Sequence, residues 1–203
     1  GHKTGFVIGS CTMAHYRYDI DTGHLEALVD GELVLEYAPS NEPTLSLSTM
    51  QVETARQALR PIVDNPNDLR SRAPMTTDAG KDWAPWIAIG DEEMEDELQP
   101  LVDHRATTAG GAEFVSLQYI YDNYTGYDTQ EQIRNFLKDG YENHGLVYAL
   151  IIGDFGETNR VSKLTTYGNT LNSTADLYYS DLDGTWDGNG NHLYGENTDG
   201  LDY

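Results

Sequence analysis

Cysteine is nearly absent from this chain of 203 residues, because Cys11 is the only one. A single cysteine excludes an internal disulfide framework. Cys11 lies among small and apolar residues in a strand-like stretch, which indicates a buried, inert thiol, since a reactive thiolate needs an open, electropositive setting. No stretch approaches the roughly 20 apolar residues that a membrane-spanning helix needs. We therefore expect neither a disulfide-rich module nor a membrane span.

Basic residues are also scarce, with 12 Lys and Arg against 34 Asp and Glu, and the formal net charge is −22. Such a field repels nucleic-acid phosphates and anionic lipid surfaces, so it argues against nucleic acid as a partner. It attracts cations and suits a protein outside a cell or in salt water. Sequons for N-glycosylation at Asn123 and Asn172 agree with export, although such triplets often arise by chance. We expect an extracellular or cell-surface location.

Residues 1–60 alternate apolar and polar side chains in the manner of β-strands. Asp21-Thr22-Gly23 is typical of a turn, and Asp30-Gly31 between two alternating runs is a strong hairpin signal. Thr49–Val63 has apolar residues near helical spacing until Pro61, which predicts a short helix or an irregular segment. We expect residues 1–63 to form a small antiparallel β module.

Residues 64–82 lack any periodicity and are rich in Pro, Asn and Asp, which predicts a linker. Arg70 and Arg72 lie within it. They are either ordinary solvated residues or a processing site, because flexible polar linkers are where proteases cut.

From residue 83 the chain alternates strands with helices. Apolar runs predict three strands, at Trp86–Gly90, Glu113–Tyr121 and Leu146–Gly153. Asp91 is a candidate cap for the first helix, and Asp128 for the second, with Glu131 placed as in a capping box. Strands and helices that alternate with short connections predict an α/β domain with a parallel sheet over residues 83–203.

The loop after the third predicted strand carries the best candidate site. Carboxylates and amides recur there at alternate or near-alternate positions, at Asp181, Asp183, Asp187, Asn189, Asn191 and Glu196. A hard cation takes six to eight oxygen ligands of this kind, so the loop predicts a Ca²⁺ site. The match to an EF-hand fails at His192 and Thr198, where Gly and Glu are required. A solvated acidic turn is the alternative.

Several of these pieces together resemble gingipain-type cysteine peptidases. The resemblance rests on four segments in order, at Trp83–Gly90, Asp128–Tyr141, Val147–Asp154 and Asp176–Glu196. Residues 6–38 resemble the β-rich pro-region that precedes such domains. The resemblance implies a three-layer, caspase-like parallel sheet that is incomplete in this chain, preceded by the antiparallel β module. It also implies a Ca²⁺ requirement and peptide or protein substrates.

In that family a Cys thiolate attacks the scissile carbonyl, with a His in a Gly-His-Gly setting as base. This sequence contains no Gly-His-Gly and no cysteine beyond Cys11, so the resemblance assigns it no catalytic residue. Our hypothesis is the N-terminal portion of a secreted cysteine endopeptidase zymogen. Its partner, the C-terminal remainder of the catalytic domain, would bring the His and Cys on the same precursor or a second chain. Taken alone, the chain is not expected to cleave peptides. The alternative is a non-catalytic, Ca²⁺-stabilised extracellular surface or filament module.

Overall fold

The computed structural model describes residues 16–27, 29, 45–69, 82–153, 161–166, 169–174, 176–196 and 199. Contacts divide the chain into a small unit, residues 7–43, and a large unit that holds residues 44–203. Among the described residues, none of the helices is long and apolar enough to span a membrane.

The small unit contains one described hairpin, with β1 (Tyr16–Asp19) antiparallel to β2 (His24–Ala27). The Asp19 carboxylate accepts hydrogen bonds from the backbone N–H groups of Asp21 (2.9 Å) and Thr22 (3.0 Å), which closes the turn. Gly23 takes φ = 69°, a conformation that glycine adopts without strain. The predicted turn at Asp21-Thr22-Gly23 is therefore confirmed, and it joins the two strands of this hairpin. The hairpin predicted around Asp30-Gly31 lies outside the described residues.

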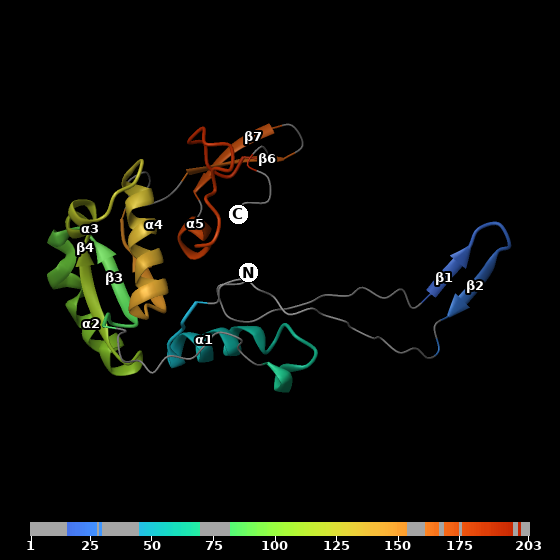
Figure 1. The fold of residues 1–203 in the computed structure, drawn as a ribbon, viewed down its shortest axis with the longest axis horizontal. Helices are drawn as coiled ribbons and strands as arrows, with labels where there is room; N and C mark the ends of the chain where they lie inside the picture. The colour runs from blue at the N-terminus through green and yellow to red at the C-terminus, as the bar shows by residue number, and fades with distance from the viewer. Residues whose placement is uncertain are drawn as a thin grey trace. The chain divides into compact units, whose positions relative to one another are not determined.

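A three-stranded parallel sheet forms the centre of the large unit (Figure 1). The strand order is β4 (Ala112–Ser116), β3 (Trp86–Gly90), β5 (Tyr148–Ile151). All five residues of β3 are buried, as expected for a central strand. This mixed α/β architecture, with a separate antiparallel hairpin, agrees with an incomplete caspase-like fold.

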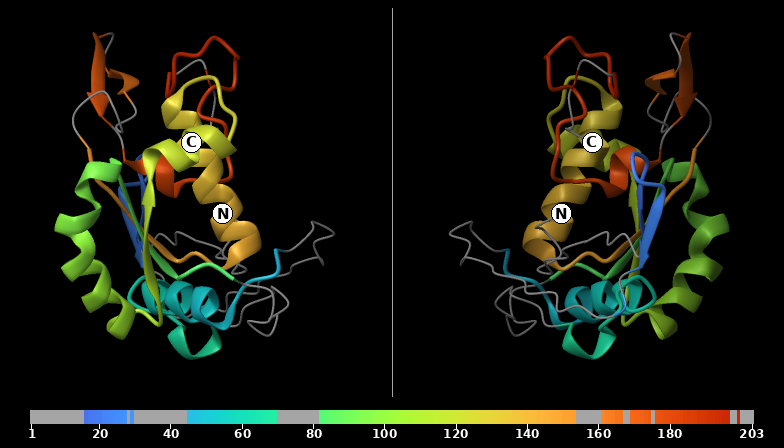
Figure 2. Two further views of the ribbon diagram at one scale, coloured as in Figure 1. Left: turned by 90° about the vertical axis from the view of Figure 1, so that its left-hand side faces the viewer. Right: turned by 90° about the vertical axis from the view of Figure 1, so that its right-hand side faces the viewer.

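Helices cover both faces of this sheet, so the large unit has three layers (Figure 2). Ile87 and Ile89 point to the face covered by α4 (Thr129–Asp139), whereas Trp86 and Ala88 pack with the α2 face. Successive side chains of a strand alternate between faces, so one short apolar strand supplies both cores. On α4, Ile133, Phe136 and Leu137 form a buried stripe.

The helix starts obey the predicted capping chemistry in one of two cases. Asp128 caps α4, because its carboxylate accepts from the Glu131 N–H at 2.9 Å. Glu131 itself reaches back to the N–H of Tyr127 instead of that of Asp128. The prediction for Asp91 is wrong, because its side chain makes no capping hydrogen bond. The helical segment after Asp91 begins with the short 3₁₀ turn η3 (Glu92–Met94), and α2 (Glu95–Thr108) follows.

The predicted second strand is too long. It ends at Ser116, and Leu117–Asn123 forms helix α3 instead of continuing to Tyr121. The Ser116 hydroxyl accepts from the Tyr119 N–H at 3.2 Å and so caps the helix. An apolar run without caps fits a strand or a buried helix equally well, and the serine decides between them.

Helix α1 (Thr49–Leu59) belongs to the large unit, where Val52 packs in one cluster with Tyr141, and the 3₁₀ turn η2 (Pro66–Asp68) follows it. Gln51 is 3% exposed, and its side-chain amide donates to the backbone carbonyls of Tyr141 (2.7 Å) and Leu146 (3.0 Å). The Gln51 oxygen accepts from the Ser48 N–H at 2.8 Å, which completes a capping box. Contacts therefore group α1 with the α/β unit.

A hairpin and a short helix follow β5 in a region where the sequence predicts only loop. Strand β6 (Val161–Thr166) pairs antiparallel with β7 (Asn169–Thr174), and α5 (Leu177–Ser180) comes after them. These short polar strands, VSKLTT and NTLNST, carry only one Leu each, so their apolar periodicity is weak.

Candidate functional site

The acidic loop, residues 176–196, folds back onto the end of the large unit where α4 begins. The ring of His192 stacks on that of Tyr127, with centroids 3.6 Å apart and planes 4° from parallel. Tyr127 lies between α3 and α4, and α3 starts where β4 ends, so the loop lies at the carboxyl ends of the strands. Open parallel sheets place their chemistry at this edge.

Arg134, a buried cation on α4, holds the first half of the acidic loop. It is 5% exposed, and its guanidinium donates to the carbonyl oxygens of Tyr178 (2.9 Å), Asp181 (2.5 Å) and Gly184 (2.6 Å). The guanidinium carbon also lies 5.0 Å from the centre of the Tyr178 ring. Arg134 is not among the site residues predicted from the sequence.

Buried aromatic rings anchor the same loop in the core. Tyr178 packs edge-on against Tyr179, Trp186 and Tyr194, and all four rings are at most 6% exposed. Trp186 takes φ = 62°, a left-handed conformation that is costly for a bulky residue. Its ring N–H donates to the Asp181 carboxylate at 3.1 Å. The loop is thus a packed part of the unit, with the strain at Trp186 offset by its burial.

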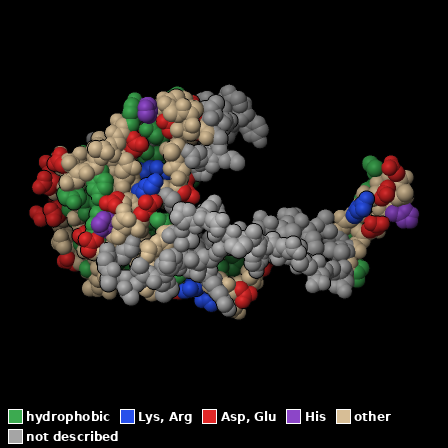
Figure 3. Space-filling view, in the orientation of Figure 1, with side chains coloured by type: hydrophobic (Ala, Val, Ile, Leu, Met, Phe, Trp, Pro, Cys, Tyr) green, Lys and Arg blue, Asp and Glu red, His purple; other side chains and the backbone are tan. Residues whose placement is uncertain are grey.

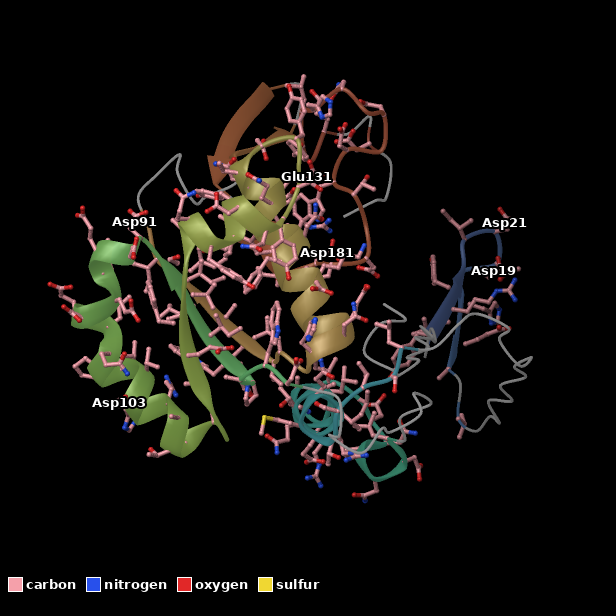
Figure 4. The ribbon with its side chains drawn as sticks, turned by 60° about the vertical axis from the view of Figure 1, so that its left-hand side comes forward. Asp19, Asp21, Asp91, Asp103, Glu131 and Asp181 are labelled. Atoms are coloured by element: carbon pink, nitrogen blue, oxygen red, sulfur yellow. The ribbon has the colours of Figure 1, made fainter. Side chains whose placement is uncertain are left out.

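Asp181 and Asp183 form a carboxylate pair beside α4, where Figure 4 places Asp181. Burial raises the pKa of Asp181, and so does the neighbouring carboxyl of Asp183, while the Trp186 N–H and the charge of Arg134 act in the opposite direction. The pair therefore disfavours full ionisation, and a proton or a cation stabilises it.

The second half of the loop contains the other four predicted metal ligands. Asp187 accepts from the backbone N–H groups of Asn191 (2.9 Å) and His192 (3.1 Å), and Asn189 accepts from the Asn191 N–H at 3.0 Å. The Asn191 side-chain amide donates to Glu196 at 2.8 Å. Among the described residues, no three His, Cys, Asp or Glu side chains converge on one point.

The carboxyl group of Asp199 lies next to this half of the loop, and it was not among the predicted metal ligands. Asp199 is 6% exposed, and one of its oxygens accepts from the Glu196 N–H at 2.6 Å. Its other carboxylate oxygen is buried and has no hydrogen-bond partner.

A pocket of about 660 Å³ lies between the acidic loop and the outer edge of the sheet. Its apolar wall comes from α4, the turn after it and β5, and its rim comes from the loop. The lining includes Leu137, Tyr141, Ala149, Ile151, Tyr179 and Asp181.

Strand β5 is the wall of this pocket, and one of its edges is unpaired among the described strands. The N–H groups of Tyr148 and Ile152 donate to the carbonyls of Pro85 (2.9 Å) and Ile89 (2.8 Å), which lie on the β3 side. In a parallel ladder alternate residues point to opposite sides, so the N–H and C=O of Ala149 point away from β3. An unpaired edge of this kind is a template for another strand.

A histidine bridges two carboxylates at the opposite end of α4. His144 lies in the π turn η4 (Gly140–His144), with Nδ1 2.6 Å from an Asp82 oxygen and Nε2 3.4 Å from an Asp139 oxygen. Its ring stacks on Trp83, with centroids 4.4 Å apart. The carboxylates lie on opposite sides of the ring, so this is a bridge between chain segments and not a metal site.

Asp139 is the central acceptor of this network. The side chains of Asn143 (2.7 Å) and Tyr124 (2.8 Å) both donate to it. Burial opposes ionisation of Asp139, but these hydrogen bonds and the charge of His144 outweigh it and lower its pKa. The hydrogen bond with His144 also lowers the pKa of Asp82.

The comparison with protein families decides the identity of this chain. The family model for peptidase family C25, the gingipain family, matches residues 82–201. The chain belongs to this family. No curated protein and no solved structure gave a match.

The C25 match supports the first hypothesis, a portion of a cysteine peptidase that acts on proteins. It starts at residue 82, next to the predicted boundary at residue 83, and it covers the sheet, α4 and the acidic loop. The predicted processing residues Arg70 and Arg72 lie outside the described residues, as does Cys11.

Proposed function

We propose that this chain is the N-terminal portion of a secreted gingipain-like cysteine endopeptidase, and that a further segment bearing the catalytic His and Cys docks on the edge of β5 that faces away from β3. The observation that supports it is that no described strand pairs with this edge, which lies beside a pocket of about 660 Å³. Ala149, at the middle of that edge, is exposed and offers a backbone donor and acceptor to a next strand.

The pocket walls fit this occupant. Leu137, Leu146 and Ile151 supply an apolar surface on the α4 face, which a strand and its following helix would cover in a three-layer fold. The carboxylates of Asp176 and Asp181 stand on the rim, at the carboxyl ends of the strands. Catalytic side chains on neighbouring strand ends would meet the substrate there.

The test is Ala149→Pro in the enzyme translated from the complete reading frame. Proline removes the outward N–H but none of the N–H groups that bond to β3, so this chain expressed alone should keep its melting temperature. Peptidase activity should fall by about 10-fold or more, because the new ladder loses a hydrogen bond and meets the proline ring. Ala149→Ser keeps the N–H and is the matched control.

Full activity of the Ala149→Pro enzyme would contradict the proposal that a further strand pairs with this edge of β5. A reading frame that continues past Tyr203 without a His and Cys of this family would overturn the peptidase proposal itself. We expect the complete enzyme to lose its activity when its thiol is alkylated, and we expect the present chain alone to have no activity.

We also propose that the precursor is a zymogen cut in the linker at Arg70 or Arg72. Helix α1 lies before that linker but contacts the α/β unit through Gln51, so it should stay bound after the cut. Intact-mass analysis of the native protein should find an N-terminus near Ser71 or Ala73, together with a retained fragment that contains α1. Only uncut chains in an active preparation would contradict the processing step.

A further inference from the structure

The outer edge of β4 lies on the opposite side of the sheet from β5, and no described strand pairs with it (Figure 1). The hydrogen bonds of β3 show which backbone groups of β4 point outward. The carbonyl of Ile89 accepts from the Ile152 N–H at 2.8 Å on the β5 side, so the adjacent residue Ala88 directs its N–H and C=O toward β4. In a parallel ladder such a residue bonds to the two neighbours of its register partner, which is Phe114. The N–H and C=O of Phe114 therefore point away from β3.

A groove of about 370 Å³ follows this edge of β4. Its floor is the strand itself, residues 113–116. One wall contains Trp83 and Phe136 from the α4 side of the sheet, and the other contains Glu92 of η3 and Glu95 of α2. Side chains from both layers can line one groove because it opens at the edge between them.

The groove is strongly acidic, and its described lining residues include no Lys or Arg. Its four carboxylates, all on exposed residues, are those of Asp82, Glu92, Glu95 and Glu113. The Glu113 carboxylate accepts from the backbone N–H of Ala84 at 3.3 Å, which holds it beside the start of β3. Carboxylates gathered along a groove concentrate a negative potential there and attract a cationic partner.

Aromatic rings supply the apolar part of the same groove. The ring of Tyr119, on α3, is exposed, and that of Trp83 is half-buried and stacks on Phe136 with centroids 4.8 Å apart. The methylene stems of Lys and Arg pack against such rings, and their charged ends are attracted to the ring faces. Negative charge, aromatic surface and an unpaired strand edge thus occur together.

We propose that this groove binds an extended, Lys- and Arg-rich segment of another protein, which adds to the sheet as a further strand beside β4. The outward N–H and C=O of Phe114 pair with the backbone of that segment, and the carboxylates attract its basic side chains. A second copy of this chain is a poor occupant, because it also carries a net charge of −22. The groove lies on the opposite edge of the sheet from the β5 pocket, so this binding does not depend on the proposed function.

The experiment is fluorescence anisotropy with the full chain of 203 residues and a fluorescein-labelled peptide. The peptide has about ten residues, in which Lys alternates with Thr, a good strand former. We expect saturable binding at low ionic strength that weakens as salt is added. The same peptide with Glu in place of Lys should not bind. Methylation of the central backbone nitrogens keeps the charge but removes donors from both edges, and it should weaken binding by about 10-fold or more.

Variants of the protein locate the binding site. Glu92→Gln combined with Glu95→Gln should weaken binding by about 5-fold or more, as expected for two exposed ion pairs. Glu113→Gln keeps an oxygen for the Ala84 N–H and should weaken it by about 2-fold or more. Glu93→Gln is the matched control, because Glu93 is exposed on η3 but does not line the groove, and it should stay within about 2-fold. An equal loss in Glu93→Gln and Glu92→Gln would indicate general attraction to an acidic chain and overturn the site.

Amide hydrogen exchange reports directly on the strand edge. At saturation the peptide should slow exchange of the Phe114 N–H by about 10-fold or more, while the outward N–H of Ala149 on β5 keeps its rate. Protection of Ala149 instead of Phe114, protection of neither, or full binding of the methylated peptide would overturn the added strand. These readouts measure binding and not peptidase activity, so their outcome is separate from that of the proposed function.

Discussion

The buried guanidinium of Arg134 gives the sharpest test of how the acidic loop is held. Arg134→Met keeps most of the side-chain volume but removes three hydrogen bonds to carbonyls, of 2.9, 2.5 and 2.6 Å. Hydrogen bonds from a charged donor contribute roughly 1.5–3 kcal/mol each. Part of that sum only offsets the cost of burying the guanidinium, so we expect a loss of about 3 kcal/mol.

This loss of stability should appear first in the acidic loop itself. Amide hydrogen exchange in residues 176–186 should accelerate by about 100-fold, which is what 3 kcal/mol corresponds to, while β3 keeps its protection. If the loop melts together with the domain, the melting temperature should fall by about 6–12 °C, at 2–4 °C per kcal/mol for a chain of this size. Mass spectrometry of exchanged peptides separates these two outcomes.

Two further variants serve as controls, one for the positive charge and one for an arginine that lies over an aromatic ring. Arg134→Lys keeps the charge but cannot span three carbonyls, so it should fall between the wild type and Arg134→Met. Arg105→Met removes an exposed arginine whose guanidinium carbon is 5.9 Å from the Trp86 ring centre, and it should change stability by less than about 0.5 kcal/mol. If Arg134→Met left the exchange of the loop unchanged, or if Lys replaced Arg fully, the hydrogen bonds would not be what holds the loop.

Two other predictions concern the opposite end of the unit. Gln51→Ala removes the buried amide that donates to the carbonyls of Tyr141 and Leu146 and should cost about 2–3 kcal/mol in urea denaturation, whereas Gln57→Ala, exposed on the same helix, should cost almost nothing. Asp139→Asn removes a carboxyl with a lowered pKa, which stabilises the fold above pH ~4 and loses this effect as the pH falls through its native pKa. Denaturation at a series of pH values should show a flatter acid limb for Asp139→Asn, and the original slope for the exposed Asp103→Asn.

Strong local signals explain which parts of the fold could be predicted from the sequence. The continuous apolar run Trp86–Gly90 has the length of a buried strand and is too short for a buried helix. Asp128 begins a helix whose apolar stripe has one period throughout. By contrast, Glu113–Tyr121 carries apolar residues that suit either a strand or a helix, and the cap at Ser116 was overlooked. Strands β6 and β7 have too few apolar residues to show any period.

The acidic loop was predicted as a segment, but the partners of its side chains were not. Loop composition indicated where carboxylates and amides gather, yet it did not show that Arg134 binds the backbone of Asp181 whereas Asp199 accepts from the Glu196 N–H. The first of these contacts comes from α4, more than 40 residues earlier in the chain. Arg134 itself follows Ile133 directly and lies three residues before Leu137 on the buried side of α4, and this position was the available signal.

The charge distribution of the unit explains why the acidic loop needs the buried cation of Arg134. Carboxylates crowd the outer face of α2, the red surface in Figure 3, but these are solvated and repel one another only weakly. In the acidic loop the carboxyl group of Asp181 is partly buried, so its ionised form needs a nearby cation. Arg134 supplies that cation permanently, since an arginine does not lose its proton.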